Sequence, residues 1–428
     1  MNMKSILASR KCLALLLVCL AAAVPAQELR VSAPPHPRID RGRLARIDDL
    51  VNAYVRSNWI KGVVTIVVKD GQVVQYKGYG WADAEAQKPM PNNAIFRIMS
   101  QTKAIVSVGA MTLFEEGRFQ LDDPISDFIP EFRHPVVLDT CNPADGSYTT
   151  VPARREIAFR DLLTHTSGLD YPDIGSDKIK AIYAKAGIPS GLGDFDASLL
   201  EKMRLLAKLP LAHQPGEKWT YGLNSDLLGC LIEVMSGMSL EDFLKQRLFE
   251  PLGMKDTAFN LPADRWDRLA TVYTEDDQGR ILRWGKTFRN IDPDYPKMKK
   301  RYFSGGAGLS STALDYAIFL QMLLNHGAYR GHMILAPRTV ELMLQNQIGD
   351  LSLGKNKFGL GFEIVTPAGA AQGLRNAGTF AWGGYYGTTY WADPKEHLVC
   401  LIMTQQTPNR HGDLAKKFET LVYSSLKE

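Results

Sequence analysis

A serine and a lysine stand three residues apart, at Ser100 and Lys103, within residues 96–103. The sequence predicts one turn of helix here, which would place both side chains on one face with their Cβ atoms about 5–6 Å apart. A serine hydroxyl is a poor nucleophile until a neighbouring base takes its proton, and a lysine amine can act as that base. The spacing therefore indicates nucleophilic catalysis by Ser100. The alternative is a chance match in which Lys103 only extends to solvent.

A tyrosine and a pair of glycines further along the chain could complete this chemistry. Tyr221 lies at or just before an apolar stretch that predicts a helix ending near Gly237, and a tyrosine hydroxyl can pass a proton between nucleophile and leaving group. Residues 380–387 read Phe-Ala-Trp-Gly-Gly-Tyr-Tyr-Gly, and adjacent glycines let an extended backbone approach a bound group closely. A backbone N–H there could pair with that of Ser100 to hold a developing oxyanion. The structural alternatives are a packed tyrosine and a glycine-rich bend at a sheet edge.

The elements that must position these residues follow from the periodicity of the chain. Strands are predicted over residues 62–69 and 72–78, joined by an Asp-Gly turn, and again over residues 358–365, 387–392 and 397–404. Helices are predicted over residues 39–59, 104–114, 197–208, 240–248, 312–326 and 414–426. Loops are predicted over residues 141–151, 170–196 and 260–300, the last as a long surface excursion.

Strands near both ends of the chain, with helices between them, predict an α/β (α+β) fold. We expect one antiparallel sheet built from residues 39–95 and 305–428 and flanked by helices, with a central, mostly helical subdomain over residues 96–304. The chain of 428 residues is 45% hydrophobic and 22% charged, which is the composition of an ordinary globular protein with a sizeable core.

The first 26 residues have the pattern of a secretory signal peptide. Lys4, Arg10 and Lys11 precede an apolar run over residues 12–23, and a small-residue site predicts cleavage after Ala26. We therefore expect a periplasmic or secreted protein in which residues 27–428 form the mature domain that carries Ser100 and Lys103. Loss of the three cations lowers the net charge from +4 to +1, which leaves no basic field for nucleic acid. No later stretch predicts a membrane anchor.

The spacing of cysteine, histidine and acidic residues indicates no metal site, and no cofactor motif is found, so we expect neither. Cys230 and Cys400 lie in apolar segments and are predicted to be buried, whereas Cys141 is predicted in a loop. Whether any of the three forms a disulfide is left open. His165 follows a predicted short helix and is interpreted as hydrogen-bonded structure. The absence of G-x-S-x-G and H-E-x-x-H motifs disfavours an α/β-hydrolase and a zinc hydrolase.

Taken together, the motifs resemble those of the serine β-lactamase and penicillin-binding-protein superfamily, whose S-x-x-K pattern matches residues 100–103. Tyr221 and the W-G-G sequence at residues 382–384 follow in the family's order, and the resemblance spans residues 39–426. Two positions depart from class C β-lactamases. Leu223 stands at the asparagine of their Y-x-N motif, with Asn224 one residue later, and Trp382 stands at the lysine of their K-T-G motif. The combination is most similar to the family VIII carboxylesterases.

This resemblance implies a β-lactamase-like fold and a serine hydrolase that cleaves small carboxylic esters through an acyl-enzyme. It makes Ser100 the nucleophile, Lys103 the base and Tyr221 the proton relay. The other site residues that it implies are the oxyanion donors Ser100 and Tyr385, the pocket residue Trp382, and the substrate-binding residues Gly383, Gly384 and Asn224. Two alternatives remain: a β-lactamase or D-amino-acid peptidase or amidase on the same fold, and a non-catalytic binding protein. The expected partner is a small-molecule ester or amide, and the oligomeric state is left open.

Overall fold

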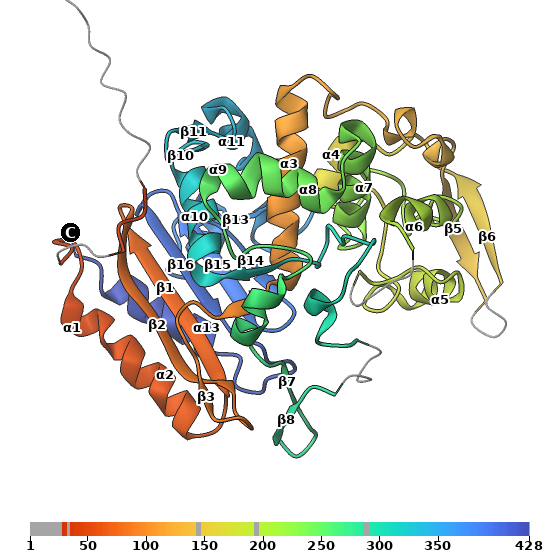
Figure 1. The fold of residues 1–428 in the computed structure, drawn as a ribbon. Coiled ribbons are helices and arrows are strands. Elements are labelled where there is room, and N and C mark those ends of the chain that lie inside the picture. The colour runs from red at the N-terminus through yellow and green to blue at the C-terminus, as the bar shows by residue number, and fades with distance from the viewer. Residues whose placement is uncertain (1–27, 32–34, 143–146, 192–196, 286–290, 428) are drawn as a thin grey trace, which may run out of the picture.

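The computed structural model is built on an eight-stranded antiparallel sheet with the strand order β12-β13-β14-β15-β16-β1-β2-β3 (Figure 1). The structure describes residues 28–31, 35–142, 147–191, 197–285 and 291–427, so the predicted signal peptide lies outside the described residues. The sheet strands are β1 (Gly62–Lys69), β2 (Gln72–Asp83), β3 (Lys88–Pro89), β12 (Lys357–Phe358), β13 (Glu363–Ile364), β14 (Phe380–Gly384), β15 (Thr388–Asp393) and β16 (Leu398–Met403). A sheet made from both ends of the chain confirms the predicted fold class.

Strand β1 is central because it pairs with β16 on one side and β2 on the other. Every residue of β1 is buried, since helices cover both faces of the sheet. A strand covered on both faces has a continuous apolar run in place of alternation. This explains the unbroken β-branched sequence at residues 63–68.

Two hydrophobic layers hold the helices against the sheet. On one face Trp391 and Cys400 pack with Val51 and Phe418 of the terminal helices, which are α1 (Arg41–Leu44), α2 (Arg46–Arg56) and α13 (Leu414–Ser424). The opposite face packs against α3 (Thr102–Glu115) and α10 (Ala313–Leu324), and this larger core continues into the helical region. The larger layer fixes the first turn of α3, which carries Lys103 of the S-x-x-K motif.

The remaining elements lie mainly between β4 and β14 in the sequence. The helices there are α4 (Phe159–Thr164), α5 (Asp177–Lys185), α6 (Leu199–Leu206), α7 (Asn224–Ser236), α8 (Leu240–Leu244), α9 (Glu250–Leu252), α11 (Pro337–Met343) and α12 (Pro367–Ala370). The small strand pairs are β4 (Ile95–Arg97) with β9 (Ser310–Thr312), β5 (Val136–Cys141) with β6 (Tyr148–Pro152), β7 (Tyr273–Glu275) with β8 (Ile281–Arg283), and β10 (Ala328–Tyr329) with β11 (His332–Met333). None of the helices in the described part of the chain has the length and apolar character that a membrane span requires.

The predicted helical turn over residues 96–103 is wrong in its first half. Phe96 belongs to strand β4 and pairs with Ser311, and Ser100 sits in a single 3₁₀ turn, Met99–Gln101, just before α3. The cause is Met99, whose φ of 51° lies in the left-handed region and separates the strand from the helix.

Two predicted loops also contain regular structure. Cys141 ends strand β5, and the partner strand β6 is exposed along its whole length, so the hairpin lacks the alternating pattern that predicts strands. The predicted loop over residues 170–196 includes α5, whose short buried face consists of Ile179, Ile182 and Tyr183. The cysteines of the described residues, Cys141, Cys230 and Cys400, are free thiols, and the last two are buried as predicted.

The segment 260–300 is more than a surface excursion. It buries Trp284, Ile291 and Tyr295 against Met99 and Tyr386 in a small separate cluster, the excursion cluster. The polar composition of the segment conceals these few apolar residues, which lie far apart in the sequence.

Replacing Phe418 by alanine tests the packing of the terminal helix. The ring is fully buried and meets Trp391 edge-on, with 5.6 Å between ring centroids, so we expect Phe418→Ala to lower the free energy of unfolding by about 3–5 kcal/mol. Tyr148 on β6 is 40% exposed, and Tyr148→Ala should change stability by less than about 1 kcal/mol. Urea unfolding followed by circular dichroism measures both, and equal shifts in the two variants would contradict this account of the core.

Candidate active site

Ser100 is placed by a strained turn that is held on one side by the excursion cluster. Ile98 donates its N–H to the carbonyl of Leu309 at 3.1 Å, which ties the end of β4 to the segment before β9. Met99 then adopts a positive φ, which costs an ordinary side chain about 1–2 kcal/mol. Its thioether sulfur accepts a hydrogen bond of 3.5 Å from the hydroxyl of Tyr295. Burial of Met99 in the cluster therefore stabilises the turn that presents Ser100.

Three side chains predicted from the sequence meet at the Ser100 hydroxyl. The Tyr221 hydroxyl donates to Ser100 Oγ at 2.6 Å, and Lys103 Nζ lies 3.3 Å from the same oxygen. Ser100 is partly exposed, whereas Lys103 is only 3% exposed. The hydroxyl is thus open to a ligand on one side and bonded to an amine and a phenol on the other.

The amine of Lys103 is held by a backbone carbonyl from a distant loop. Lys103 Nζ donates to the Gly306 carbonyl oxygen at 2.7 Å and lies 4.6 Å from the centroid of the Tyr221 ring and 5.5 Å from that of Tyr171. A Cβ on Gly306 would stand 2.4 Å from Asp226 Oδ2 and 3.4 Å from Lys103 Nζ. Only glycine therefore lets this backbone reach the amine.

A buried carboxyl lies behind this lysine. Asp226, in the first turn of α7, accepts hydrogen bonds from Ser304 at 2.7 Å and from Tyr302 at 3.3 Å. Burial raises the pKa of Asp226, while the hydrogen bond from Ser304 and the positive charge of Lys103 act in the opposite direction. The surroundings of Lys103 thus include one acidic group that is out of contact with solvent.

Aromatic rings surround Tyr221 and fix its orientation. Its ring centroid lies 5.2 Å from His165, 5.5 Å from Tyr171, 5.7 Å from Trp382 and 6.1 Å from Trp219, the last in a stacked arrangement. Such ring pairs contribute about 0.5–1.5 kcal/mol each beyond their buried area. The phenol therefore approaches Ser100 from a rigid aromatic wall.

His165 is buried and neutral. Its Nδ1 lies 3.0 Å from Nδ2 of Asn224, and its backbone carbonyl accepts the N–H of Thr220 at 2.8 Å, next to Tyr221. Burial lowers the pKa of His165 to about 3, and the charge of Lys103 acts in the same direction. The interpretation of His165 as hydrogen-bonded structure is confirmed, and its role is to support the Tyr221 segment.

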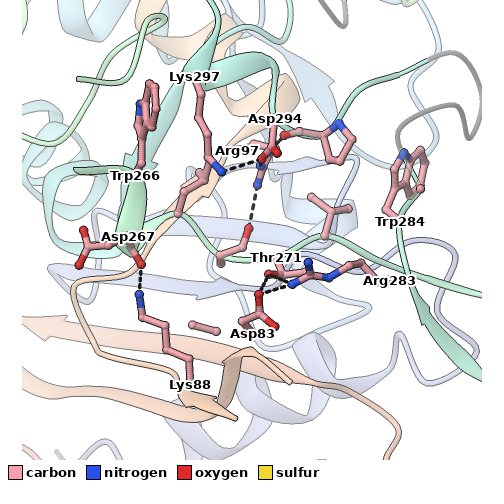
Figure 2. Close-up of a pocket in the computed structure, with 16 residues that line it drawn as sticks. Asp83, Lys88, Arg97, Trp266, Asp267, Thr271, Arg283, Trp284, Asp294 and Lys297 are labelled. Carbon is pink, nitrogen blue, oxygen red and sulfur yellow. Dashed lines mark hydrogen bonds and ion pairs between the residues drawn. The ribbon is translucent and has the colours of Figure 1, made fainter. Parts of the chain in front are cut away.

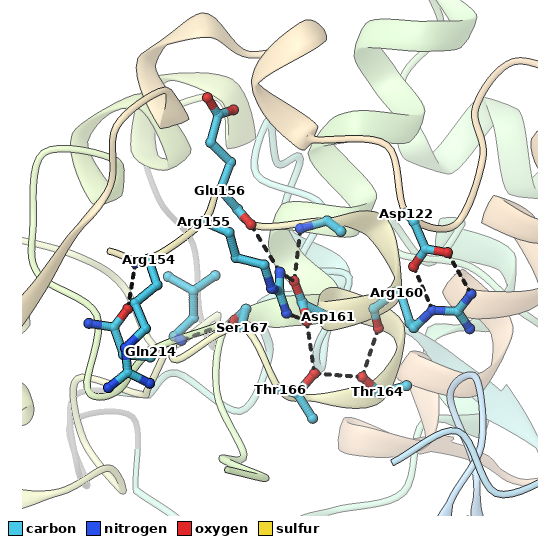
Figure 3. A network of polar contacts seen from close by, with 12 residues as sticks. Asp122, Arg154, Arg155, Glu156, Arg160, Asp161, Thr164, Thr166, Ser167 and Gln214 are labelled. Carbon is cyan, nitrogen blue, oxygen red and sulfur yellow. Dashed lines mark hydrogen bonds and ion pairs between the residues drawn. The ribbon is translucent and has the colours of Figure 1, made fainter. Parts of the chain in front are cut away.

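A polar network locks the loop that carries His165 (Figure 3). Arg155 donates two hydrogen bonds, of 2.6 and 2.8 Å, to the buried carboxylate of Asp161, which also accepts from Thr166 at 3.1 Å. The next residue, Ser167, makes a separate hydrogen bond, in which its hydroxyl donates to Oδ1 of Asn224 at 2.5 Å. A paired and fully bonded carboxylate of this kind fixes backbone geometry. The bonds of Asp161 and the separate bond from Ser167 to Asn224 thus hold the loop between α4 and the first residue of α7, and Asn224 in turn contacts His165.

The candidate catalytic cavity is a cleft of about 410 Å³ in front of Ser100. Its lining consists of Ser100, Tyr221, Glu363, Arg375, Ala381, Trp382, Gly383 and Thr389. Strand β14 closes one side and lies directly against the turn of Ser100, because a Cβ on Gly384 would stand 2.5 Å from the carbonyl oxygen of Ile98. The second glycine of the W-G-G motif is thus required by this close approach.

The structure places the other predicted residues unequally. Trp382 and Gly383 line the cavity, and Tyr385 follows β14 with its ring packed beside Tyr386. The implied role of Asn224 in substrate binding is corrected. Asn224 is fully buried and faces His165 and Ser167, because it begins α7 and its side chain points back into the protein. Its place in the sequence, near Tyr221, gave no sign of this orientation.

Comparisons with known proteins place the chain among hydrolases and acyl-transferring enzymes. A sequence model for the family described as Beta-lactamase matches residues 47–423. Protein Rv1367c of Mycobacterium tuberculosis (strain ATCC 25618 / H37Rv) is 35% identical over 371 residues, covering 83% of this chain and 88% of that protein. Esterase EstB of Burkholderia gladioli is 30% identical over 375 residues, covering 84% of this chain and 90% of that protein. The solved structure of EstCE1, described as a hydrolase with promiscuous acyltransferase activity, aligns with a TM-score of 0.76 at 27% identity and covers 89% of this chain and 99% of that one.

Replacing His165 by asparagine should reduce the acid sensitivity of folding. Between about pH 6.5 and about pH 3 the unfolded chain binds a proton at His165 that the folded protein excludes, so the free energy of unfolding falls as the pH drops through this range. We expect the loss between pH 8 and pH 5 to be smaller by about 2 kcal/mol in His165→Asn. Asparagine tolerates the left-handed backbone at this position.

Urea unfolding at the two pH values measures this difference, and the exposed His332→Asn serves as control. An unchanged pH dependence in His165→Asn would show that this histidine titrates alike in the folded and unfolded protein.

Proposed function

The chain belongs to the beta-lactamase family, as the resemblance predicted, and we propose that it cleaves small carboxylic esters through an acyl-enzyme on Ser100. The observation that carries the proposal is the contact of one partly exposed hydroxyl with a phenol at 2.6 Å and an amine at 3.3 Å. These distances suit proton transfer in the attack of a serine on an ester carbonyl.

The proposed acylation passes one proton from Ser100 to the leaving group through Lys103 and Tyr221. The Lys103 ammonium first loses a proton to water, and the resulting amine takes the proton of Ser100 as Oγ bonds to the ester carbonyl carbon. Tyr221 then gives its proton to the alkoxide that leaves as the ester C–O bond breaks. The Lys103 ammonium returns a proton to Tyr221. An alcohol leaves, and Ser100 carries the acyl group. In the second half water attacks by the reverse path, which releases the carboxylic acid and restores Ser100.

The oxyanion formed in these steps needs N–H donors. We assign the backbone N–H groups of Ser100 and Tyr385, because β14 ends beside the turn that carries the nucleophile. Donors of this kind typically contribute about 10²–10³-fold in rate each.

The chemistry of the cavity supports an ester in preference to a β-lactam or a D-amino-acid peptide. Trp382 offers a ring where class C enzymes offer a lysine for the substrate carboxylate, and Phe358 and Trp219 extend this aromatic surface. Arg375 also lines the cavity, but it pairs with Glu419 at 2.8 Å and lies 5.0 Å from the centroid of the Trp391 ring. The relative EstB is an esterase, which agrees with this choice.

Acyl transfer to an alcohol is a second candidate for the deacylation step. EstCE1 is described as a hydrolase with promiscuous acyltransferase activity. The aromatic wall beside Ser100 could hold an alcohol in the place of water. We further propose that the enzyme acts in the periplasm or outside the cell, after removal of residues 1–26; this rests on the sequence pattern alone.

Replacing Ser100 by alanine tests the nucleophile. We expect Ser100→Ala to lower kcat/KM for a short-chain p-nitrophenyl ester by at least about 10³-fold, because no covalent intermediate can form. A fluorophosphonate probe should label Ser100 in the wild type, as mass spectrometry of peptides can show. Ser236→Ala, at the end of α7, should keep full activity.

Retained activity in Ser100→Ala would rule out the acyl-enzyme. If the wild type hydrolyses nitrocefin faster than esters, the β-lactamase alternative replaces the esterase proposal.

Replacing Tyr221 by phenylalanine tests the proton relay. The ring keeps its aromatic neighbours and only the hydroxyl is lost, so kcat should fall by about 10²–10⁴-fold while KM changes little. Tyr329→Phe, which removes a buried hydroxyl that accepts from Leu29, is the control and should leave kcat unchanged. A rise in KM without a fall in kcat would show that Tyr221 only binds substrate.

A further inference from the structure

A second cavity of about 470 Å³ is lined by residues of β2, β3, β4 and β8 and of the segments beside β7 and before β9 (Figure 2). It shares no lining residue with the catalytic cavity. A volume of this size is typical of sites for small molecules. Its lining residues are Ala82, Asp83, Lys88, Arg97, Trp266, Asp267, Leu269, Ala270, Thr271, Val272, Arg283, Trp284, Gly285, Pro293, Asp294 and Lys297.

Four separate segments direct cations to this cavity. They are Lys88 of β3, Arg97 of β4, Arg283 of β8 and Lys297 of the 3₁₀ turn Tyr295–Lys297. The lining also contains the three carboxylates Asp83, Asp267 and Asp294, so the lining residues themselves sum to one positive charge, and Glu85 lies just outside at 3.4 Å from Arg283. Arg283 pairs with Asp83, and Lys88 donates to the backbone carbonyl of Asp267.

Arg97 is the most constrained of the four. Its side chain is 2% exposed, and it donates to the carbonyl oxygens of Pro293 at 2.5 Å and Ala270 at 2.8 Å. The carboxylate of Asp294 lies 3.8 Å from Arg97 and only 2.9 Å from Lys297. The close partners of the buried guanidinium are thus neutral oxygens, which include the side-chain oxygen of Gln405 at 3.2 Å, and the nearby carboxylates are Asp292 and the Asp294 that Lys297 shares. A buried positive charge in this state favours an anion nearby.

Two indole rings line the same cavity, and the exposed one, Trp266, supplies an apolar surface. Trp284 is 2% exposed and packs edge-on against Tyr386 with 5.5 Å between ring centroids, whereas Trp266 is 41% exposed and donates its indole N–H to the carbonyl of Leu261. Figure 2 shows the two rings on opposite sides of the cavity, with Arg97, Asp294 and Lys297 between them. Flat apolar groups pack well on such rings.

We propose that this cavity is a second binding site, for a small organic anion that pairs a carboxylate or phosphate with a flat apolar group. The anion contacts Lys297 beside Arg97, and the apolar group lies on the exposed ring of Trp266. Arg97 ends β4 three residues before Ser100, so the bound molecule contacts the strand that leads into the turn of the proposed nucleophile. The site does not depend on the proposed function.

The ion pair of Lys297 and Asp294 gives a test, because removing its cation and removing its anion should change the affinity for an anionic probe in opposite directions. Phenyl phosphate and benzoate are the probes, and isothermal titration calorimetry on the full chain measures their dissociation constants. We expect saturable binding of at least one probe, and the preferred one identifies the anionic group. Lys297→Gln removes a cation and leaves Asp294 to neutralise Arg97, so the probe should bind about tenfold more weakly. Asp294→Asn releases both cations, so the probe should bind more tightly.

Lys180→Gln is the matched control. Lys180 of α5 also pairs with an aspartate three residues away, at 3.6 Å, and it lines neither cavity. It should leave binding unchanged. The proposal is overturned if neither probe binds saturably, if Lys297→Gln and Asp294→Asn shift the affinity in the same direction, or if Lys180→Gln matches Lys297→Gln. It is also overturned if Trp382→Ala in the catalytic cavity abolishes binding while Lys297→Gln does not.

Discussion

The need of one buried amine for partners determines how the candidate site is assembled. Removing an amine from water costs free energy unless other groups accept hydrogen bonds from it. Lys103 meets that need with the Ser100 hydroxyl, the Gly306 carbonyl and the rings of Tyr171 and Tyr221. These groups come from four parts of the chain, so the amine is satisfied only when the helical region and the loop before β9 both close on the start of α3. Assembly of the site therefore requires the tertiary fold.

Strands β1, β2, β15 and β16 and the long helices could be predicted because their patterns are local, whereas the single strand expected over residues 358–365 is the pair β12 and β13. The β-branched run of β1, the Asp-Gly turn and the apolar faces of α7 and α10 each follow from neighbouring residues. Elements defined by long-range contacts could not be predicted in this way. Strand β4 exists because Phe96 pairs with Ser311, and the exposed hairpin of β5 and β6 has no buried face to leave a pattern. The positive φ of Met99, which ends β4 and begins the turn of Ser100, has no sign in the residue type.

The candidate site shows the same division. The spacing of Ser100 and Lys103 and the order of the motifs were enough to bring the hydroxyl, the amine and Tyr221 together. The contribution of Gly306 was missed, because a backbone carbonyl has no side-chain signature and the glycine is required only by the space that Asp226 and Lys103 leave. Asn224 was misassigned for a related reason. Its distance from Tyr221 in sequence is that of a substrate-binding residue, but the phase of α7 turns it toward His165, where it is needed to hold the neutral ring.

The 3₁₀ turn Tyr295–Lys297 contacts both Met99, which precedes Ser100, and the lining of the second cavity. Tyr295 donates to the sulfur of Met99, and Lys297, two residues later on the same 3₁₀ turn, pairs with Asp294 at the second cavity. A change of charge at Lys297 therefore acts on the turn that also holds Met99 in its left-handed conformation. Because Met99 immediately precedes Ser100, a shift of this turn by a fraction of an ångström would alter the direction of the Ser100 hydroxyl toward Tyr221. The strain at Met99 is thus best understood together with the charged cavity behind it, since one short turn of the excursion supports both.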